Sequence, residues 1–196
     1  MLDDSSLDAL FRNARTQNGW RDEPVADALL VQLYDLVKLG PTTANSTPAR
    51  FLFLRTPAAR ERLRPHLGAT NVSKVMSAPV TAIIGFDTRF YELLPRLFPH
   101  NPGARDWFAG AAKEAHAYTN AFRNGSLQGG YFILAARALG LDCGPMSGFD
   151  LDGVDREFWQ GTTVRTNFIC ALGHGDPAKV FPRSPRLAFD EACKLL

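Results

Sequence analysis

The sequence has few cysteines, and none of them is spaced for a metal site or a disulfide framework. Cys143, Cys170 and Cys193 are odd in number, far apart, and form no Cys-x-x-Cys pair. Small disulfide-stapled domains and zinc ribbons need paired cysteines, so both classes are excluded. The opening residues, MLDDSSLDALF, also lack the apolar run of a secretory signal. We therefore expect a reduced protein located in the cytoplasm.

Two further absences limit the possible partners. With 22 basic and 20 acidic residues, the formal net charge is only +2. A balanced charge gives no reason to expect binding to nucleic acid or to a membrane surface. The longest apolar stretches, such as Val80–Ile84, are far shorter than the roughly 20 residues needed to cross a bilayer.

The common catalytic motifs are missing as well. There is no Gly-x-Ser-x-Gly elbow and no Walker A lysine motif, and the four histidines show no metal-ligand spacing, so no metal is expected. Gly173–Ala178 matches Gly-x-Gly-x-x-Ala in letters. A dinucleotide site needs a helix to begin there, and Pro177, Pro182 and Pro185 prevent one. We interpret this segment as a tight turn.

What the chain does contain is a globular composition and alternating helix and strand patterns. Its 196 residues, 45% of them hydrophobic, favour a single domain over 1–196. Apolar periodicity predicts helices near residues 6–11, 27–39, 57–67, 120–139 and 151–158, and strands over 51–54, 78–86 and 167–173. A turn-rich break is expected at 143–148, a loop or lid at 87–110, and an extended tail at 175–186. The pattern alone indicates α/β or α+β.

Polar and basic residues gather where these elements end. They lie in Arg15–Asn18, Pro41–Asn45, Asn71–Lys74, Pro145–Gly148 and the tail, which holds Arg183 and Arg186. Arginine suits bidentate contacts to phosphate, and hydroxyls and amides suit a polyol chain and a heteroaromatic edge. The residues alone therefore suggest a phosphorylated flat ligand. The alternative is that they are helix caps, turns and surface charges.

The same segments, in the same order, resemble the nitroreductase family of FMN-dependent flavoproteins. The similarity runs through Arg15-Thr16-Gln17-Asn18-Gly19-Trp20, Pro41-Thr42-Thr43-Ala44-Asn45-Ser46-Thr47-Pro48, Asn71 with Lys74, Gly140-Leu141 to Gly148-Phe149, and the basic tail from Lys179 to Arg186. This resemblance implies an α+β sandwich with a mostly antiparallel sheet flanked by helices. It also implies an intertwined homodimer, FMN as cofactor and NAD(P)H as co-substrate.

The resemblance also implies roles for individual residues. Phosphate contacts would come from Arg15, Thr16, Arg183 and Arg186, with Asn18 standing where a second basic residue is usual. The ribityl chain and ring face would meet Pro41, Thr42, Thr43 and Asn45, contributed by the other subunit. The flavin's pyrimidine edge would meet Asn71 and Lys74, and its reactive nitrogen would lie near Pro145, Met146, Ser147 and Gly148. Lys74 would support the reduced ring, and no side chain is assigned as a catalytic group.

Further stretches are Asn18–Arg21, Ser46–Phe51, Ala121–Asn124, Gly144–Asp150, Pro185–Leu187 and Phe189–Cys193. In these stretches the chain most resembles one subgroup of that family, the malonic semialdehyde reductases of pyrimidine breakdown. This implies reduction of a small aldehyde that carries a carboxylate, with Arg50 or Arg123 as the carboxylate anchor. The reduction also needs a proton; no side chain stands out as its donor, and water and Tyr131 both stay open. Ser147 stands where an acidic residue is common, which suits an anionic substrate. Two alternatives remain open: a broad-specificity nitro or quinone reductase, and an FMN-binding protein without turnover.

Overall fold

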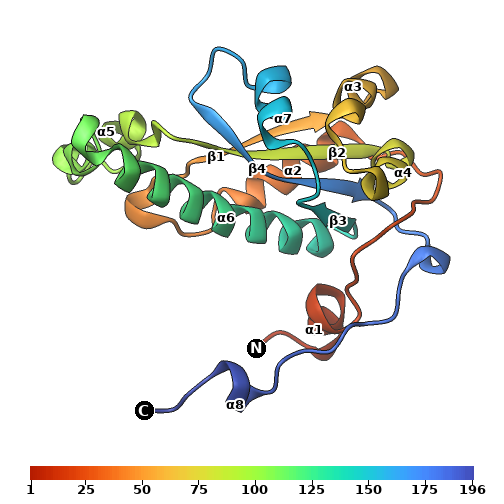
Figure 1. The fold of residues 1–196 in the computed structure, drawn as a ribbon. Coiled ribbons are helices and arrows are strands. Elements are labelled where there is room, and N and C mark those ends of the chain that lie inside the picture. The colour runs from red at the N-terminus through yellow and green to blue at the C-terminus, as the bar shows by residue number, and fades with distance from the viewer.

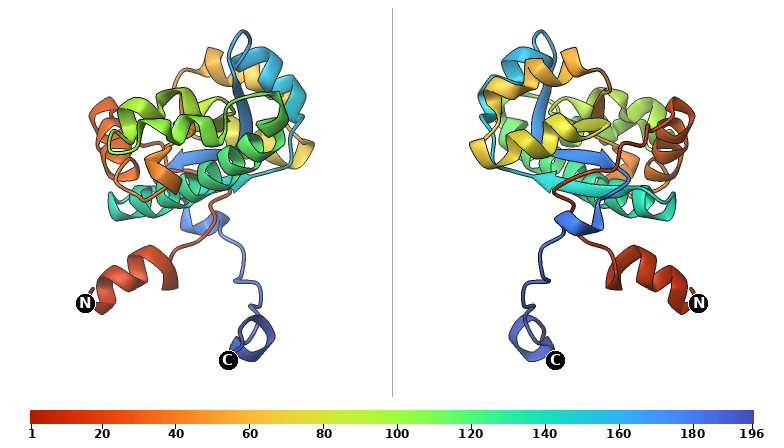
Figure 2. Two further views of the ribbon diagram at one scale, coloured as in Figure 1. Left: turned by 90° about the vertical axis from the view of Figure 1, so that its left-hand side faces the viewer. Right: turned by 90° about the vertical axis from the view of Figure 1, so that its right-hand side faces the viewer.

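A computed structural model describes all residues, 1–196, as one sheet surrounded by helices (Figures 1 and 2). The strands are β1 (Ala49–Leu54), β2 (Val80–Asp87), β3 (Asp142–Met146) and β4 (Val164–Gly173). The α-helices are α1 (Asp4–Leu7), α2 (Asp27–Val37), α3 (Pro57–Leu63), α4 (Ala69–Ser77), α5 (Leu94–Leu97), α6 (Glu114–Ala138), α7 (Leu151–Phe158) and α8 (Phe189–Ala192). Short π or 3₁₀ helices are η1 (Asp8–Arg12), η2 (Thr43–Asn45), η3 (Arg64–His66), η4 (Phe90–Leu93), η5 (Pro102–Trp107), η6 (Ala111–Lys113) and η7 (Pro177–Lys179).

The sheet is antiparallel throughout, in the order β1-β2-β4-β3. Its two central strands are the two longest apolar runs, and Ile83 of β2 lies opposite Ile169 of β4. Both isoleucines are fully buried. Continuous apolar character is typical of a strand covered on both faces. The predicted strands at 51–54, 78–86 and 167–173, and the α+β sandwich, are therefore confirmed.

Helices cover both faces of the sheet (Figure 1). On one face, α2 and α6 pack through Leu33, Val37 and Phe132 against Ile84. On the other face, α3, α4 and α7 contribute Leu63, Val75 and Val154 to a second core. Each buried aliphatic side chain contributes about 1.5–3 kcal/mol to stability, so the two cores hold the sandwich together.

The long helix α6 lies close to the sheet because two of its glycines face bulky side chains. A Cβ on Gly125 would come within 2.8 Å of Phe86, and one on Gly129 would collide with the Phe168 ring. The helix ends with Gly140 at φ +78°, a left-handed position that glycine adopts readily. The two glycines thus permit close packing of the helix on the sheet, and the helix begins earlier than predicted, at Glu114.

The predicted turn-rich break at 143–148 is wrong for most of its length, because residues 142–146 form strand β3. Cys143 pairs with Leu172, and Pro145 lies opposite Cys170. A proline has no N–H to donate and is tolerated only where a ladder bond can be absent. Here it lies on an edge strand, so the glycine and proline signals that indicated a turn are compatible with pairing.

The segment 87–110 is not an open loop. It folds into η4, α5 and η5, which enclose a third core containing Phe90, Leu94, Ala104 and Phe108, packed against Ala117 and Ala121 of α6. Phe90 and Phe108 contact each other edge to face, with ring centroids 5.0 Å apart. The expected loop or lid at 87–110 is therefore wrong for Phe90 and Phe108, which belong to the core.

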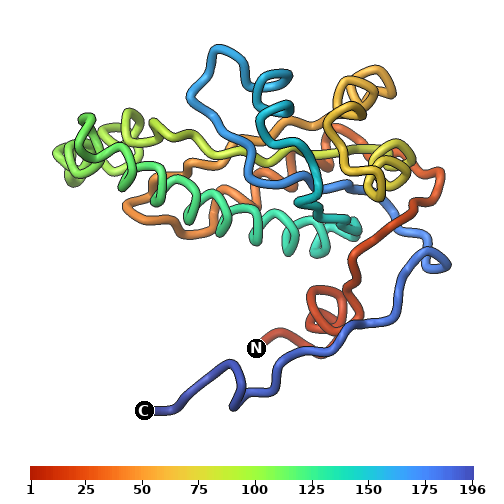
Figure 3. The backbone as a smooth tube through the Cα atoms, in the orientation of Figure 1, coloured from red at the N-terminus to blue at the C-terminus, as the bar shows by residue number.

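The two ends of the chain leave the body of the molecule together (Figures 1 and 3). The tail from residue 175 onward is extended apart from η7 and α8, as its prolines predicted. Among the helices, none combines the length and the apolar character that crossing a bilayer requires. We call these two ends, residues 1–20 and 175–196, the N-terminal and C-terminal arms. Several apolar side chains stay exposed on them, among them Phe11, Phe181 and Phe189.

Candidate active site

The N-terminal arm runs along the edge of the sheet before it leaves the body. Thr16 forms a parallel bridge with Cys143, and the Gln17 N–H donates to the Cys143 carbonyl at 2.9 Å. Trp20 forms a second bridge with Gly175 at the start of the tail. Edge strand β3 is thus partly paired by the arm, and this pairing brings residues near both chain ends to one place.

Four arginines line a cavity of about 370 Å³ between the two arms: Arg15, Arg137, Arg183 and Arg186. None of the four forms an ion pair with a carboxylate. Arg183 donates to the carbonyl oxygens of Arg12 at 2.6 Å and Ala14 at 3.1 Å, and Arg15 donates to that of Phe181. Four positive charges around one space repel one another unless an anion joins them. The cavity therefore suits a multiply charged anion such as a phosphate.

Five of the residues predicted for phosphate binding line this one cavity: Arg15, Thr16, Asn18, Arg183 and Arg186. The structure adds Arg137, which was not predicted. Arg137 lies in the last turn of α6, where its Nη1 donates to the Leu10 carbonyl at 3.2 Å and its buried Nε has no acceptor. In the sequence it looked like an ordinary helix-terminal cation, and no local signal distinguished it.

Asn71 and Lys74 of α4 lie beside the far end of β3. The Asn71 Nδ2 donates to the Gly148 carbonyl at 3.0 Å, and the Trp20 indole donates to the Lys74 carbonyl at 3.0 Å. Gly148 fits because a Cβ there would come within 2.9 Å of the Asn71 Nδ2. The structure therefore brings Asn71 together with the 145–148 segment.

Lys74 is an unusual lysine because it is buried without an acidic partner. Its side chain is only 9% exposed, and a Cβ on Gly144 would lie 3.2 Å from its Cδ. Burial lowers the pKa of Lys74 below the ordinary lysine value, and the nearby Cys170 opposes this shift only in part. A partly desolvated ammonium without a counter-charge is destabilising unless a ligand supplies negative charge.

A second cavity, of about 500 Å³, begins where β3 ends. Pro145, Met146 and Ser147 form one wall, and Gly130 and Ile133 of α6 form part of the other. The cavity leads along α6 toward the exposed side chains of Phe122 and Leu127. The residues predicted to lie near the reactive nitrogen of the flavin, Pro145 to Ser147, are thus next to an apolar face of α6 that this chain leaves uncovered.

The Pro41–Asn45 segment lies elsewhere in the chain. It joins α2 to β1 at the end of the molecule away from the two arms (Figure 1). The Thr43 N–H donates to Asn124 Oδ1 at 2.8 Å, and the Asn45 Nδ2 donates to the Leu97 carbonyl at 2.9 Å. Within one chain, Thr42, Thr43 and Asn45 therefore do not join the arginine cavity.

The two candidate substrate anchors differ in how free they are. Arg50 donates to the carbonyls of Thr47, Pro48 and Ala49 and pairs with Asp87 at 2.8 Å. Its guanidinium is thus occupied by its own loop. Arg123 is exposed, forms no ion pair, and lines the open groove on α6. Of the two, only Arg123 is free to meet a substrate carboxylate.

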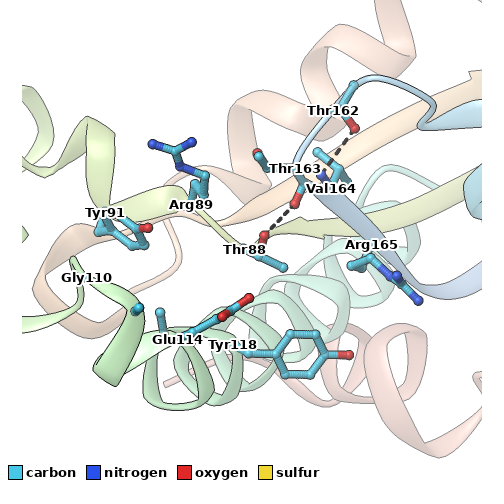
Figure 4. A pocket seen from close by; sticks show the side chains of 12 residues that line it. Thr88, Arg89, Tyr91, Gly110, Glu114, Tyr118, Thr162, Thr163, Val164 and Arg165 are labelled. Carbon is cyan, nitrogen blue, oxygen red and sulfur yellow. Dashed lines mark hydrogen bonds between the residues drawn. The ribbon is translucent and has the colours of Figure 1, made fainter.

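Another polar cavity, of about 630 Å³, lies at the far end of β2 and β4 (Figure 4). Glu114, Tyr91 and Tyr118 line it together with threonine hydroxyls. Its arginines are neutralised, because Arg89 pairs with Glu92 at 2.9 Å and Arg165 with Asp155 at 2.6 Å. It is therefore a poorer anion site than the cavity between the arms, and it contains none of the predicted site residues.

The chain is similar to known proteins over most of its length. Residues 12–174 match the model of the Nitroreductase family. A Cupriavidus pinatubonensis protein, provisionally named NADH dehydrogenase/NAD(P)H nitroreductase, is 62% identical over 189 residues, 96% of each chain. A Ralstonia pickettii protein with the same provisional name is 60% identical over 190 residues, 97% of each chain.

A solved structure from Exiguobacterium sibiricum, a provisionally named nitroreductase in complex with FMN, is similar in fold. The TM-score is 0.86 at 16% identity, and the similarity covers 100% of this chain and 98% of that one. At this identity the similarity concerns the fold alone. The match to the family model and the close relatives carry the assignment. This chain belongs to the Nitroreductase family.

Proposed function

We propose that the protein is an FMN-dependent NAD(P)H oxidoreductase whose cavity between the arms binds the FMN phosphate. The single observation that carries this proposal is the set of four arginines that share a cavity without a carboxylate. A phosphate would accept charge-assisted hydrogen bonds from Arg15, Arg183 and Arg186 and would balance the charge of Arg137, which lines the same cavity. The family's FMN complex supports the choice of ligand.

The residues beyond the phosphate also fit a flavin. Beside the end of β3, the chain offers the Asn71 amide and the ammonium of the mostly buried Lys74, both from α4, and the backbone at Ser147 and Gly148. An anion next to Lys74 would compensate the burial of its charge, and a cation there stabilises developing negative charge. When bound, FMN supplies the redox chemistry that links NAD(P)H to a second substrate.

We further propose that the protein works as a homodimer. The exposed side chains of Tyr118, Phe122 and Leu127 lie along α6, next to the cavity that begins at Pro145. A second copy on this face would bury them and could bring its own Thr42, Thr43 and Asn45 to the flavin. This arrangement accounts for the separation of the two groups of predicted residues within one chain.

For the second substrate we propose malonic semialdehyde, reduced to 3-hydroxypropionate, with Arg123 binding the carboxylate. Arg123 supports this choice because it is an exposed cation without an acidic partner beside the apolar groove. The alternative is a broad-specificity NAD(P)H nitro or quinone reductase. The names of the relatives favour the alternative.

The first experiment is to purify the protein, record its visible spectrum and identify any released chromophore by mass. Bound FMN that NADH or NADPH bleaches without oxygen is the expected result. A protein that takes up no added FMN would overturn the proposal. Bound FMN that neither nucleotide bleaches would indicate an FMN-binding protein without turnover. Steady-state rates with malonic semialdehyde and with nitroaromatics then separate the two enzyme activities.

A further inference from the structure

The loop between α2 and β1 contains a strained stretch of backbone. Ala44, Asn45 and Thr47 have φ values of +49°, +50° and +37°. Asparagine enters this left-handed region readily, but alanine and the β-branched threonine do not. Each such residue costs of order 1–3 kcal/mol and persists only where the surroundings enforce it. The surroundings of this loop therefore have to hold it in shape.

Two buried amide side chains of α6 hold the loop from the inside. Asn124 is 1% exposed and accepts from the Thr43 N–H at 2.8 Å, and Gln128 is 3% exposed and accepts from the Ala49 N–H at 2.9 Å. Residues four apart lie on the same helix face, so the two amides grip the loop before and after its strained residues. The Asn124 Nδ2 is anchored on the Asn120 carbonyl at 2.8 Å.

An ion pair fixes the end of the loop from the outside. Arg50 donates to the carbonyls of Thr47, Pro48 and Ala49 at 2.9–3.2 Å, and its other Nη pairs with Asp87 at 2.8 Å. The Asp87 N–H donates back to the Pro48 carbonyl at 2.9 Å. The loop is thus tied both to α6 and to β2.

We propose that Asn124, Gln128 and the Arg50–Asp87 pair are positioning residues that hold Thr42, Thr43 and Asn45 in the conformation that meets the flavin. This inference rests on the proposed function. A loop held in its bound shape before the ligand arrives loses less conformational freedom on binding, so the ligand binds more tightly. None of the positioning side chains needs to touch the flavin.

Removing the amide of Asn124 tests the inference, with Asn120 as the matched control. Asn120 is also a buried α6 asparagine, 7% exposed, and its Nδ2 donates to a helix carbonyl, that of His116, at 3.2 Å, but it does not bond to the loop. We expect Asn124→Ala to weaken the binding of FMN and of riboflavin by the same factor, about tenfold for one lost hydrogen bond. Asn120→Ala should leave both affinities unchanged.

A second readout does not depend on the flavin. In flavin-free protein, the Thr43 amide should exchange with solvent faster in Asn124→Ala but not in Asn120→Ala. If Asn124→Ala does not fold, Arg50→Lys is the substitute. This variant keeps a positive charge opposite Asp87 but loses the Nη1 group that donates to three carbonyls. It should weaken the binding of both flavins about threefold to fivefold.

The outcomes separate the inference from the proposed function. If the wild-type protein binds FMN and Asn124→Ala binds it as tightly as Asn120→Ala does, the inference is wrong and the proposed function stands. If the Thr43 amide of Asn124→Ala exchanges no faster than that of the wild-type protein, Asn124 does not hold the loop in place. If the wild-type protein takes up no FMN, the proposed function fails first, and the positioning role toward a flavin fails with it.

Discussion

The cavity between the arms and the loop from Pro41 to Arg50 use the same type of residue in opposite ways. All of these arginines donate to backbone carbonyls, but the four around the cavity have no acidic partner, whereas Arg50 in the loop pairs with Asp87. The cavity therefore has unsatisfied charge that a ligand can complete. The loop has satisfied charge that fixes a shape. In this molecule, an arginine is available to an anionic ligand where it has no acidic partner, and it fixes the local structure where it has one.

The largest expected effect is on FMN binding when a cavity arginine is removed. Arg186→Ala should raise the Kd for FMN about 10- to 100-fold, because a charge-assisted hydrogen bond is worth about 1.5–3 kcal/mol. Riboflavin has no phosphate, so its affinity should not change. Arg64→Ala, which removes an exposed arginine paired with Glu61, serves as the control. An equal loss for both flavins would contradict the phosphate assignment.

The next largest effect is on the stability of the flavin-free protein. We expect a substitution in the loop to lower this stability more than a substitution in the cavity does. Asp87→Ala breaks the pair with Arg50 and also removes the acceptor of the Thr163 hydroxyl, 2.6 Å away. The folded state should lose about 1–2 kcal/mol, because a partly buried guanidinium is left without its counter-charge. Arg186→Ala in flavin-free protein should change the unfolding free energy by less than about 0.5 kcal/mol. Urea unfolding of both variants measures this contrast, and a larger loss for Arg186→Ala would reverse it.

Lys74 resembles the cavity arginines in one respect, because it forms no ion pair with a carboxylate. Lys74→Met should stabilise the flavin-free protein by about 1 kcal/mol at neutral pH, since a buried charge is replaced by an apolar chain of similar length. The same change should weaken FMN binding and slow its reduction by NAD(P)H. A less stable variant would show that the ammonium already has a favourable partner.

The pH dependence of that stabilisation follows from the direction of the pKa shift. Burial lowers the folded-state pKa of Lys74 below the unfolded value of about 10.5. Between these two values the unfolded chain binds more protons, so the Lys74 contribution to the unfolding free energy rises with pH. The advantage of Lys74→Met should therefore be full below the lowered pKa and shrink toward pH 10.5. Urea unfolding of both proteins from pH 7 to pH 10 checks this trend.

The sequence predicted the parts of the fold that rest on local patterns. Val80–Phe86 and Phe168–Leu172 are continuous apolar runs, and both form central strands. β3 was missed because its Gly144 and Pro145 are locally typical of a turn, and only the edge position opposite β4 makes a strand there possible. Local preference and tertiary position disagree at that strand, and tertiary position decides the outcome.

The candidate site was predictable to the extent that the family resemblance named its residues. Arg137 was missed because it reaches the cavity only once α6 packs beside the N-terminal arm. The engagement of Arg50 was missed for a similar reason, since Asp87 lies 37 residues further along the chain. A sequence shows which residues can carry charge, but the fold decides which charges stay unpaired.

The smallest expected effect tests the cavity without any flavin. Inorganic phosphate at about 100 mM should stabilise the flavin-free protein by up to about 0.4 kcal/mol more than it stabilises Arg186→Ala, if it occupies the cavity with a Kd near that concentration. Phosphate also strengthens folded proteins in general by being excluded from their surfaces. The wild-type value alone therefore decides nothing, and the difference between the two proteins carries the test. Phosphate should stabilise Asp87→Ala as much as it stabilises the wild-type protein, because the ion pair lost in this variant lies in the loop and not in the cavity. If phosphate stabilises all three proteins equally, the four arginines do not form an anion site in the absence of the rest of FMN.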